Sequence, residues 1–223
     1  KVLMVSSNIG VSRVIDENYH NQPEKYVEGL YKLGIATPLN LDIPGAAKKP
    51  NIRKPTKQNW SKTALAWMSI GYETQVPPMN TLAFYNAIAN DGKMMKPYFV
   101  ECTERDGVAE KVNKPTLLNS ICSEATADTL TRALKRVTSE GTAKVLKNAR
   151  CQVAGKTGTS RMYLTPKEQK GSGNPYEDIN GRKRHQGTFV GFFPADEPKY
   201  TAIVVTYTGL LDMGVNVYGG AEA

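Results

Sequence analysis

The sequence is poor in the residues that most often bind metals. Its 223 residues hold only two histidines and three cysteines, which are Cys102, Cys122 and Cys151. The cysteines are widely spaced, form no Cys-x-x-Cys pair and show no metal-ligand spacing, so a zinc site is not indicated. Their odd number does not fix the redox compartment. We expect buried thiols and no metal.

Long apolar runs are also missing. No stretch approaches the roughly 18–20 consecutive apolar residues that cross a bilayer. The opening Lys1-Val2-Leu3 shows no signal peptide and leads directly into sequence that is typical of ordered structure. We therefore expect a chain that comes from the middle of a longer protein.

The charge is unbalanced, with 29 Lys and Arg against 21 Asp and Glu and a formal net charge of +8. This excess favours an anionic partner. The basic residues, however, fall in scattered loops and form neither a helical stripe nor an RNA-binding signature. We expect no nucleic-acid partner, and we interpret the run Arg182-Lys183-Arg184-His185 as a solvated loop.

One stretch combines an apolar entry with polar chemistry, and it runs from Val153 to Ser160. A short apolar segment leads into Lys156, followed by hydroxyls at Thr157 and Thr159 with Gly158 between them. Alternate side chains of a strand share a face, so the two threonines point the same way. A cation with two hydroxyls at an exposed strand edge suits a carboxylate, and the bare main chain at the glycine could add a peptide as an extra strand. The alternative is a strand with an ordinary surface lysine.

Helix signals precede this stretch. The sequence predicts five elements, in chain order: a helix of about two turns after Ser6-Ser7-Asn8, a helix capped by Asn21 and ended by Gly34, an apolar segment from Trp60 to Ile70, a helix from Pro77-Pro78 to Asp91-Gly92, and a longest helix capped by Ser123 and ended by Gly141. Leu39 to Asn59 is expected to be a long loop.

Strand signals lie between and after these helices. The sequence predicts a hairpin within Lys96–Leu118 with Asp106-Gly107 as its turn, a polar loop over 161–186, and closing strands from Thr188 to Phe193 and from Tyr200 to Thr208. Helices first and an antiparallel meander last give the α+β class. We expect a helical part over roughly residues 1–150 and a sheet part over roughly 151–223.

The early segment Ser6-Ser7-Asn8 allows two interpretations. Small polar residues before an apolar periodic stretch are good helix caps, so Ser6 and Asn8 could serve the local backbone alone. They could equally project from a tight turn into a cleft. The segment by itself does not decide between capping and function.

Together, the early Ser6-Ser7-Asn8 and the late Lys156-Thr157-Gly158-Thr159 resemble two of the three signatures of serine penicillin-binding enzymes. The sequence between and after them agrees, with segments similar to the passages of class B penicillin-binding proteins. These segments are residues 69–73 (SIGYE), 84–92 (FYNAIANDG), 141–143 (GTA) and 189–194 (FVGFFP). The resemblance covers nearly the whole chain in the right order. Ser-Ser-Asn followed by residues 9–12 (IGVS) is similar to the septal, cell-division transpeptidases.

The third signature of this family is missing. Its nucleophile lies in a Ser-x-x-Lys motif upstream of Ser-x-Asn, and no serine in this sequence has a lysine three residues on. The resemblance therefore implies a single partial transpeptidase domain over residues 1–223, truncated at both ends. The nucleophile and the first one or two strands are expected upstream, and a C-terminal helix beyond Ala223. The implied fold is that of the penicillin-binding transpeptidases and serine β-lactamases, a helical subdomain with an antiparallel sheet.

The resemblance also implies a reaction and a set of roles. A stem peptide ending in D-Ala-D-Ala would acylate the missing serine, and an amine of a neighbouring strand would then take the acyl group. The catalytic residues implied are Ser6, Asn8 and Lys156, and the substrate-binding residues are Thr157, Gly158 and Thr159. The Thr159 backbone N–H would contribute to an oxyanion hole. No metal or organic cofactor is implied.

The partners that the family implies are the peptidoglycan stem peptide, β-lactam antibiotics and, for the whole protein, divisome proteins. The implied location is the periplasmic face of the inner membrane, reached through an anchor outside this chain. Three alternatives remain open: a catalytically dead or penicillin-sensing relative, a serine β-lactamase with Glu73 as a weak candidate for the deacylating glutamate, and a generic basic α+β binding module.

Overall fold

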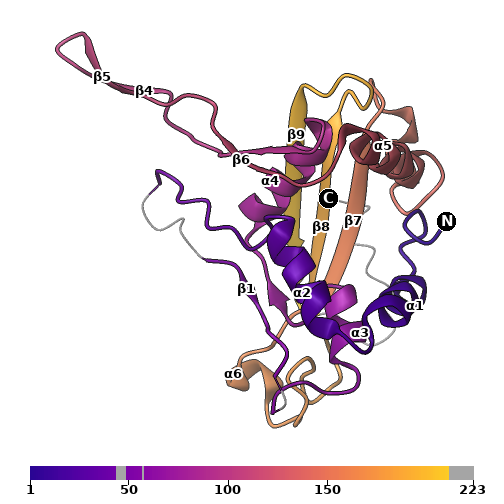
Figure 1. Cartoon of the computed structure of the whole chain (residues 1–223). Coiled ribbons are helices and arrows are strands. Elements are labelled where there is room, and N and C mark those ends of the chain that lie inside the picture. The colour runs from indigo at the N-terminus through magenta and orange to yellow at the C-terminus, as the bar shows by residue number, and fades with distance from the viewer. Residues whose placement is uncertain (44–48, 57, 211–223) are drawn as a thin grey trace. The chain divides into compact units, whose positions relative to one another are not determined.

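The computed structural model describes residues 1–43, 49–56 and 58–210 (Figure 1). The chain forms two compact units, one made of Lys1–Leu3 and Ser7–Arg132 and the other of Met4–Ser6 and Ala133–Ala223. The division falls between Arg132 and Ala133. The single partial domain, with a helical part over roughly residues 1–150 and a sheet part over roughly 151–223, stays a prediction. Within the described ranges, no helix is both long and apolar enough to span a membrane.

Four helices form most of the first unit. They are α1 (Asn8–Tyr19), α2 (Pro23–Lys32), α3 (Ala64–Ser69) and α4 (Pro78–Ala89). A core of Val27, Ile52 and Met68 joins α2 and α3, with Leu30 and Trp60 packed around it. Val27 and Leu30 lie three positions apart on α2, so both fall on the face that the helix turns to this cluster.

The starts of α1 and α2 differ from the prediction. Ser7 is the N-cap of α1, since its Oγ accepts a hydrogen bond from the Gly10 N–H at 3.1 Å, so the capping interpretation of Ser6 and Asn8 is wrong. The helix is 12 residues long, more than the two turns expected. Gln22 rather than Asn21 occupies the N-cap of α2. The reason is that Pro23 is the first helical residue, which leaves the position directly before it as the cap.

Three short antiparallel pairs complete the first unit. They are β1 (Asn51–Ile52) with β2 (Thr74–Gln75), β3 (Lys93–Met95) with β6 (Leu117–Ser120), and β4 (Cys102–Arg105) with β5 (Val108–Val112). The predicted hairpin turn is confirmed, because Asp106 and Gly107 have φ of 53° and 78°, as a two-residue turn of the I′ type requires. Figure 1 shows β4 and β5 projecting as a narrow arm from β3 and β6. The expected loop from Leu39 to Asn59 contains β1, and its residues 44–48 and 57 lie outside the described ranges.

The second unit is built on a three-stranded antiparallel sheet. Its strands are β7 (Ala154–Arg161), β8 (His185–Phe193) and β9 (Tyr200–Tyr207), side by side in that order (Figure 1). The end of helix α5 (Glu124–Ser139) and a 3-10 turn, η1 (Lys144–Asn148), belong with this sheet. Val137 of α5 packs with Ala143, Val153 and Phe189 in the core. The α+β class and the two closing strands are confirmed.

Helix α5 begins as predicted, with Ser123 as its cap. The Ser123 Oγ accepts a hydrogen bond from the Thr126 N–H at 3.3 Å. We expect Ser123→Ala to lower the free energy of unfolding by about 1 kcal/mol, because the Thr126 N–H at the helix start loses its side-chain acceptor and keeps only the Ser123 carbonyl. Chemical denaturation checks this, with Ser123→Asn as the matched control that keeps a capping oxygen. Equal losses in both variants would contradict the capping role.

The cysteines differ from the prediction of buried thiols. Cys102, Cys122 and Cys151 are all free and all partly exposed. Their positions explain this, because Cys102 lies in the projecting β4–β5 arm, Cys122 in the link between β6 and α5, and Cys151 before β7 rather than within it.

Candidate active site

Strand β7 is an edge of its sheet, because it pairs with β8 alone among the described strands. The register runs without a slip from Ala154 opposite Phe192 to Arg161 opposite His185. The next pair is hydrogen-bonded, with the Met162 N–H donating to the Arg184 carbonyl at 3.0 Å. Because such pairs alternate in an antiparallel ladder, the even-numbered residues of β7 bond to β8. The backbone groups of Thr157 and Thr159 therefore face the open edge.

Lys156 holds the Ser6 hydroxyl at this edge. Its Nζ donates to the Ser6 Oγ at 2.7 Å and to the Thr157 carbonyl at 2.8 Å, and it lies 3.4 Å from the Thr157 Oγ1. Within the described ranges Lys156 makes no ion pair. The structure thus brings the predicted site residues Ser6 and Thr157 together around the ammonium group of Lys156. No carboxylate within the described ranges neutralises this group.

The lysine is half-buried, and burial lowers the pKa of Lys156 from 10.5 to about 8. Removal from water disfavours the charged form, and the neutral oxygens around the Nζ do not offset this as a carboxylate would. The group is still mainly protonated at pH 7. An anion that enters this site would supply the missing countercharge.

This lowered pKa makes a prediction about stability. Between pH 8 and 10.5 the unfolded chain keeps the Lys156 proton while the folded chain has lost it. The unfolded state then binds more protons, so Lys156 makes the free energy of unfolding rise with pH in that window. The destabilisation caused by burying its charge is complete only below pH 8. Urea unfolding of the wild type and Lys156→Met should give a stability difference that narrows as the pH rises. A difference that stays constant from pH 7 to 10 would contradict the lowered pKa.

Ser6 reaches the site through an unusual backbone conformation. Its φ of 51° lies in the left-handed region, which costs a residue with a side chain about 1 kcal/mol or more. The preceding turn is held by the chain after α5, since the Thr142 N–H donates to the Met4 carbonyl at 3.3 Å. Gly141 allows this approach, because a Cβ there would come within 2.3 Å of the Met4 carbonyl oxygen.

The Thr142 hydroxyl joins those of Ser6 and Thr157 as a third hydroxyl of the site, and it was not among the predicted site residues. The Thr142 Oγ1 lies 2.8 Å from the Thr157 Oγ1, and both groups belong to the second unit. The only sequence signal was the position of Thr142 in the Gly-Thr-Ala segment ahead of the Lys-Thr-Gly strand.

The remaining predicted site residues have simple surroundings. Asn8 is exposed in the first position of α1 and belongs to the first compact unit. Thr159 and Gly158 are exposed on β7, and a Cβ on Gly158 would meet only the Thr188 Cβ, at an ordinary 3.8 Å. The surface over Gly158 is therefore open to a ligand.

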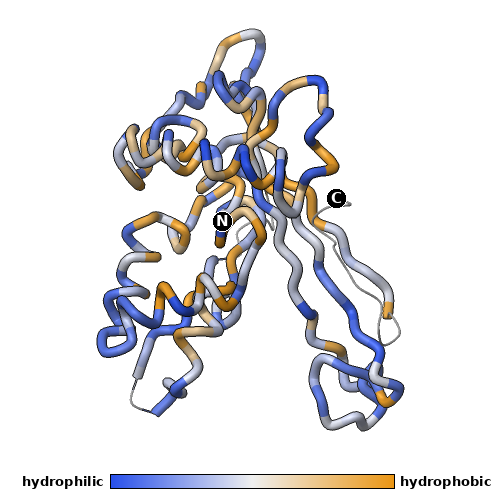
Figure 2. Tube along the Cα trace, turned by 90° about the vertical axis from the view of Figure 1, so that its right-hand side faces the viewer, coloured by the Kyte–Doolittle hydropathy of each residue, from blue (hydrophilic) through white to orange (hydrophobic). Residues whose placement is uncertain are grey.

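The segment after β7 is more ordered than the predicted 161–186 loop. It contains α6 (Pro166–Gln169), whose cap is a capping box formed by Thr165 and Glu168. In Figure 2 this segment lies at the lower end of β7, and most of its residues have the colours of hydrophilic or neutral hydropathy. The Thr-x-x-Glu spacing with a proline between is a helix-start signal that could have been read from the sequence.

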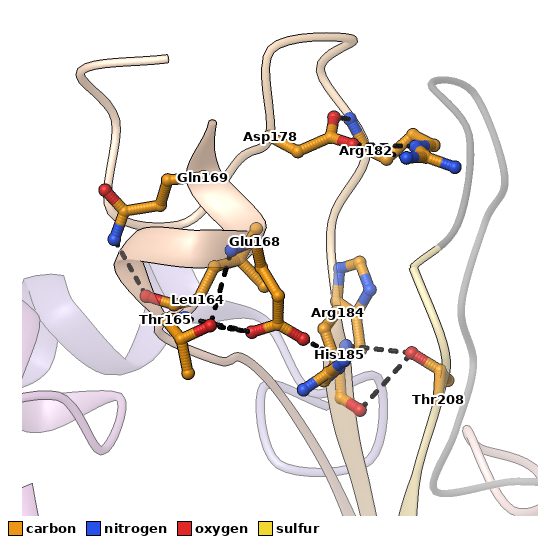
Figure 3. Close-up of polar contacts among 9 residues, drawn as sticks. All are labelled: Leu164, Thr165, Glu168, Gln169, Asp178, Arg182, Arg184, His185 and Thr208. Atoms are coloured by element: carbon orange, nitrogen blue, oxygen red, sulfur yellow. Dashed lines mark hydrogen bonds and ion pairs between the residues drawn. The ribbon is translucent and has the colours of Figure 1, made fainter. Parts of the chain in front are cut away.

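The basic run in this segment was predicted to be a solvated loop, but the structure pairs its arginines and its lysine with carboxylates. Its two arginines and its lysine each form an ion pair within the segment: Arg182 with Asp178 at 2.7 Å, Lys183 with Glu177 at 3.0 Å, and Arg184 with Glu168. Figure 3 draws the two arginine pairs. The Asp178 side chain is 0% exposed, which explains the pairing, because a buried carboxylate requires compensation. Acidic residues earlier in the segment thus fold back onto the basic run.

The site and its fold can be compared with known proteins. The profile described as the penicillin binding protein transpeptidase domain matches residues 1–219. The chain belongs to this family. As the motifs predicted, it is a class B penicillin-binding protein transpeptidase domain.

Two curated relatives have moderate sequence identity to this chain. It is 31% identical over 207 residues to the probable peptidoglycan D,D-transpeptidase PbpC of Pseudomonas aeruginosa, covering 92% of this chain and 31% of that protein. It is 29% identical over 203 residues to the penicillin-binding protein PbpB of Mycolicibacterium smegmatis, covering 87% of this chain and 29% of that protein. The chain thus spans less than a third of either relative.

Solved structures agree with the fold. Penicillin-binding protein 3 of Mycobacterium tuberculosis, complexed with aztreonam, matches with a TM-score of 0.75 at 26% identity, covering 94% of this chain and 44% of that one. The transpeptidase domain of penicillin-binding protein 3 of Burkholderia pseudomallei matches with a TM-score of 0.67 at 26% identity, covering 99% of this chain and 58% of that one. The predicted penicillin-binding transpeptidase fold is confirmed.

Proposed function

We propose that this protein is a serine-type peptidoglycan D,D-transpeptidase that cross-links stem peptides and is acylated by β-lactams. The observation that carries the proposal is the Lys156 ammonium at the open edge of β7, bonded to the Ser6 hydroxyl at 2.7 Å and without a carboxylate partner among the described residues. A half-buried cation in such surroundings suits the terminal carboxylate of a peptide or the carboxylate of a penicillin.

The residues divide the work of recognition between side chain and backbone. Lys156 supplies positive potential for the carboxylate, and the hydroxyls of Thr157 and Thr159 donate hydrogen bonds to it. The outward-facing backbone of β7 pairs with the peptide as an added strand. The Thr159 N–H serves as one of two oxyanion-hole donors, the other being the N–H of the nucleophilic serine.

The chemistry is acyl transfer through a serine ester. The serine Oγ attacks the carbonyl between the two D-alanines, the C–N bond breaks, and the departing D-alanine amine takes a proton through Ser6. A second amine then attacks the ester, the C–O bond breaks, and a proton released by that amine restores the serine hydroxyl. Asn8 binds the substrate amide and the lysine of the Ser-x-x-Lys motif. The short Lys156–Ser6 contact supports the shuttle, since a donor with a pKa of about 8 can both hold and release a proton near neutrality.

We further propose that the nucleophile lies outside these 223 residues, so that the chain alone forms no acyl-enzyme. Two facts support this: no serine here precedes a lysine by three positions, and the chain covers 31% of the PbpC relative. From the Ser-Ser-Asn resemblance we propose a role in cell division with divisome partners. We place the active domain at the periplasmic face of the inner membrane, held by an anchor outside this chain.

Fluorescent-penicillin labelling of the full-length gene product, with the 223-residue chain beside it, tests the proposal. We expect the full-length protein to label stably and the shorter chain not to label. A full-length protein that does not label would identify a catalytically dead relative instead. Rapid release of hydrolysed penicillin would indicate a β-lactamase, and labelling of the shorter chain would place the nucleophile within it.

A further inference from the structure

Thr142 lies in a rigid turn at the end of α5. The N–H groups of Gly141 and Ala143 both donate to the Val137 carbonyl, at 3.2 and 3.1 Å. Ala143 is 0% exposed and packs against Val137 in the core. Thr142 is fixed between these two anchored residues, so its side chain has a defined direction.

The hydrogen bonds among Lys156, Thr157 and Thr142 limit which of these groups can donate to a ligand. Lys156 can only donate, and its Nζ lies 3.4 Å from the Thr157 Oγ1, which therefore accepts from it. Between Thr142 and Thr157, at 2.8 Å, either hydroxyl could donate. Each hydroxyl has one proton. If Thr157 donates to Thr142, it has none left for a ligand; if Thr142 donates, the Thr157 proton is free.

We propose that Thr142 is a positioning residue, whose hydroxyl donates to Thr157 so that the Thr157 hydroxyl donates to the ligand carboxylate. This inference rests on the function proposed above. Thr157 then accepts from Lys156 and Thr142 and gives its own proton to the anion. The chain of donors ends at the carboxylate, where the negative charge makes the last hydrogen bond strongest.

The backbone of the same residue has a separate duty that a side-chain variant leaves intact. The Thr142 N–H holds the Met4 carbonyl at 3.3 Å, two residues before Ser6. Thr142→Val keeps this N–H and the shape of the side chain and removes only the hydroxyl. Thr142→Ser keeps both the N–H and the hydroxyl.

The experiment measures labelling of the full-length protein by a fluorescent penicillin over a range of concentrations. We expect Thr142→Val to raise the concentration for half-maximal rate about 3- to 10-fold, as loss of one hydrogen bond would, and to change the maximal rate less than about 2-fold. Thr142→Ser should restore wild-type behaviour. In a Thr157→Val background, Thr142→Val should have no further effect, because Thr142 acts only through Thr157.

Thr138→Val is the control for a purely structural threonine. Its Oγ1 donates to the Val153 carbonyl at 2.6 Å in the core, so its loss should lower the melting temperature without changing either labelling parameter. The inference would be overturned if Thr142→Val labels like the wild type, or if Thr142→Val has the same effect in the Thr157→Val background as in the wild type. Either outcome would leave the proposed function standing. A wild-type protein that does not label would overturn the proposed function and this inference with it.

Discussion

Replacing Lys156 with methionine is expected to lower the second-order rate constant of penicillin acylation about 100-fold or more in the full-length protein. Among the residues that the structure describes, this cation is the one basic group bonded to Ser6, and it also faces the edge where the carboxylate is proposed to bind. Removal of one well-placed donor from a site of this kind typically costs about 10²–10³ in rate. Stopped-flow or gel-based labelling measures the loss.

The same substitution is expected to raise the melting temperature below pH 8. The lowered pKa of Lys156 means that its charge is less stable in the folded protein than in water, and methionine removes that charge while filling the same space. Lys199→Met, at an exposed position in the turn before β9, is the matched control and should change neither quantity. Acylation at the wild-type rate by Lys156→Met would remove the basis of the proposed function.

Gly155→Ala is expected to destabilise the second unit strongly, by about 3 kcal/mol, the upper end of what overpacking usually costs. A Cβ at this position would come within 2.5 Å of the Phe189 ring and 2.7 Å of the Val190 carbonyl oxygen. The ring lies across this glycine and its partner Gly191 in β8, so neither obstacle can swing aside. Chemical denaturation of the full-length protein, followed by a probe in this unit, measures the effect.

Gly158→Ala is the matched control for stability and separates the two glycines of the strand. Its new Cβ meets only an ordinary contact at 3.8 Å, so we expect stability within about 0.5 kcal/mol of wild type. If a ligand lies against β7 at this point, the methyl group should slow penicillin labelling nonetheless. Similar stability losses at both glycines would show that Gly158 is closed by the protein rather than open to a ligand.

Local signals explain why most elements could be predicted. The Asp106-Gly107 turn, the Ser123 cap and the β-branched and aromatic residues of β8 and β9 each act over a few residues, so the sequence carries them directly. The errors arose where neighbouring candidates competed for one role. Ser7 rather than Ser6 caps α1, and Gln22 rather than Asn21 caps α2, because a cap is decided by which residue leaves the helical conformation.

The segment from 162 to 184 shows a second kind of limit. Its basic run looked like solvated surface because charge runs usually are, and nothing in the run itself names a partner. The pairing of Arg184 with Glu168 spans 16 positions and depends on how the segment folds back (Figure 3). Asp178 likewise becomes buried beside Arg182 only once the segment has folded back on itself.

The sequence by itself determined the family, the α+β class and the identity of the strand that carries Lys156, Thr157 and Thr159. It could do so because residue types at fixed short spacings define these features. Only the tertiary structure decided that Lys156 bonds to Ser6, which lies 150 positions away, and that Thr142 bonds to Thr157. Such contacts leave no periodic trace in the chain, because they arise from the packing of distant segments. The lowered pKa of Lys156 has the same origin, since burial and neighbouring oxygens exist only in the folded protein.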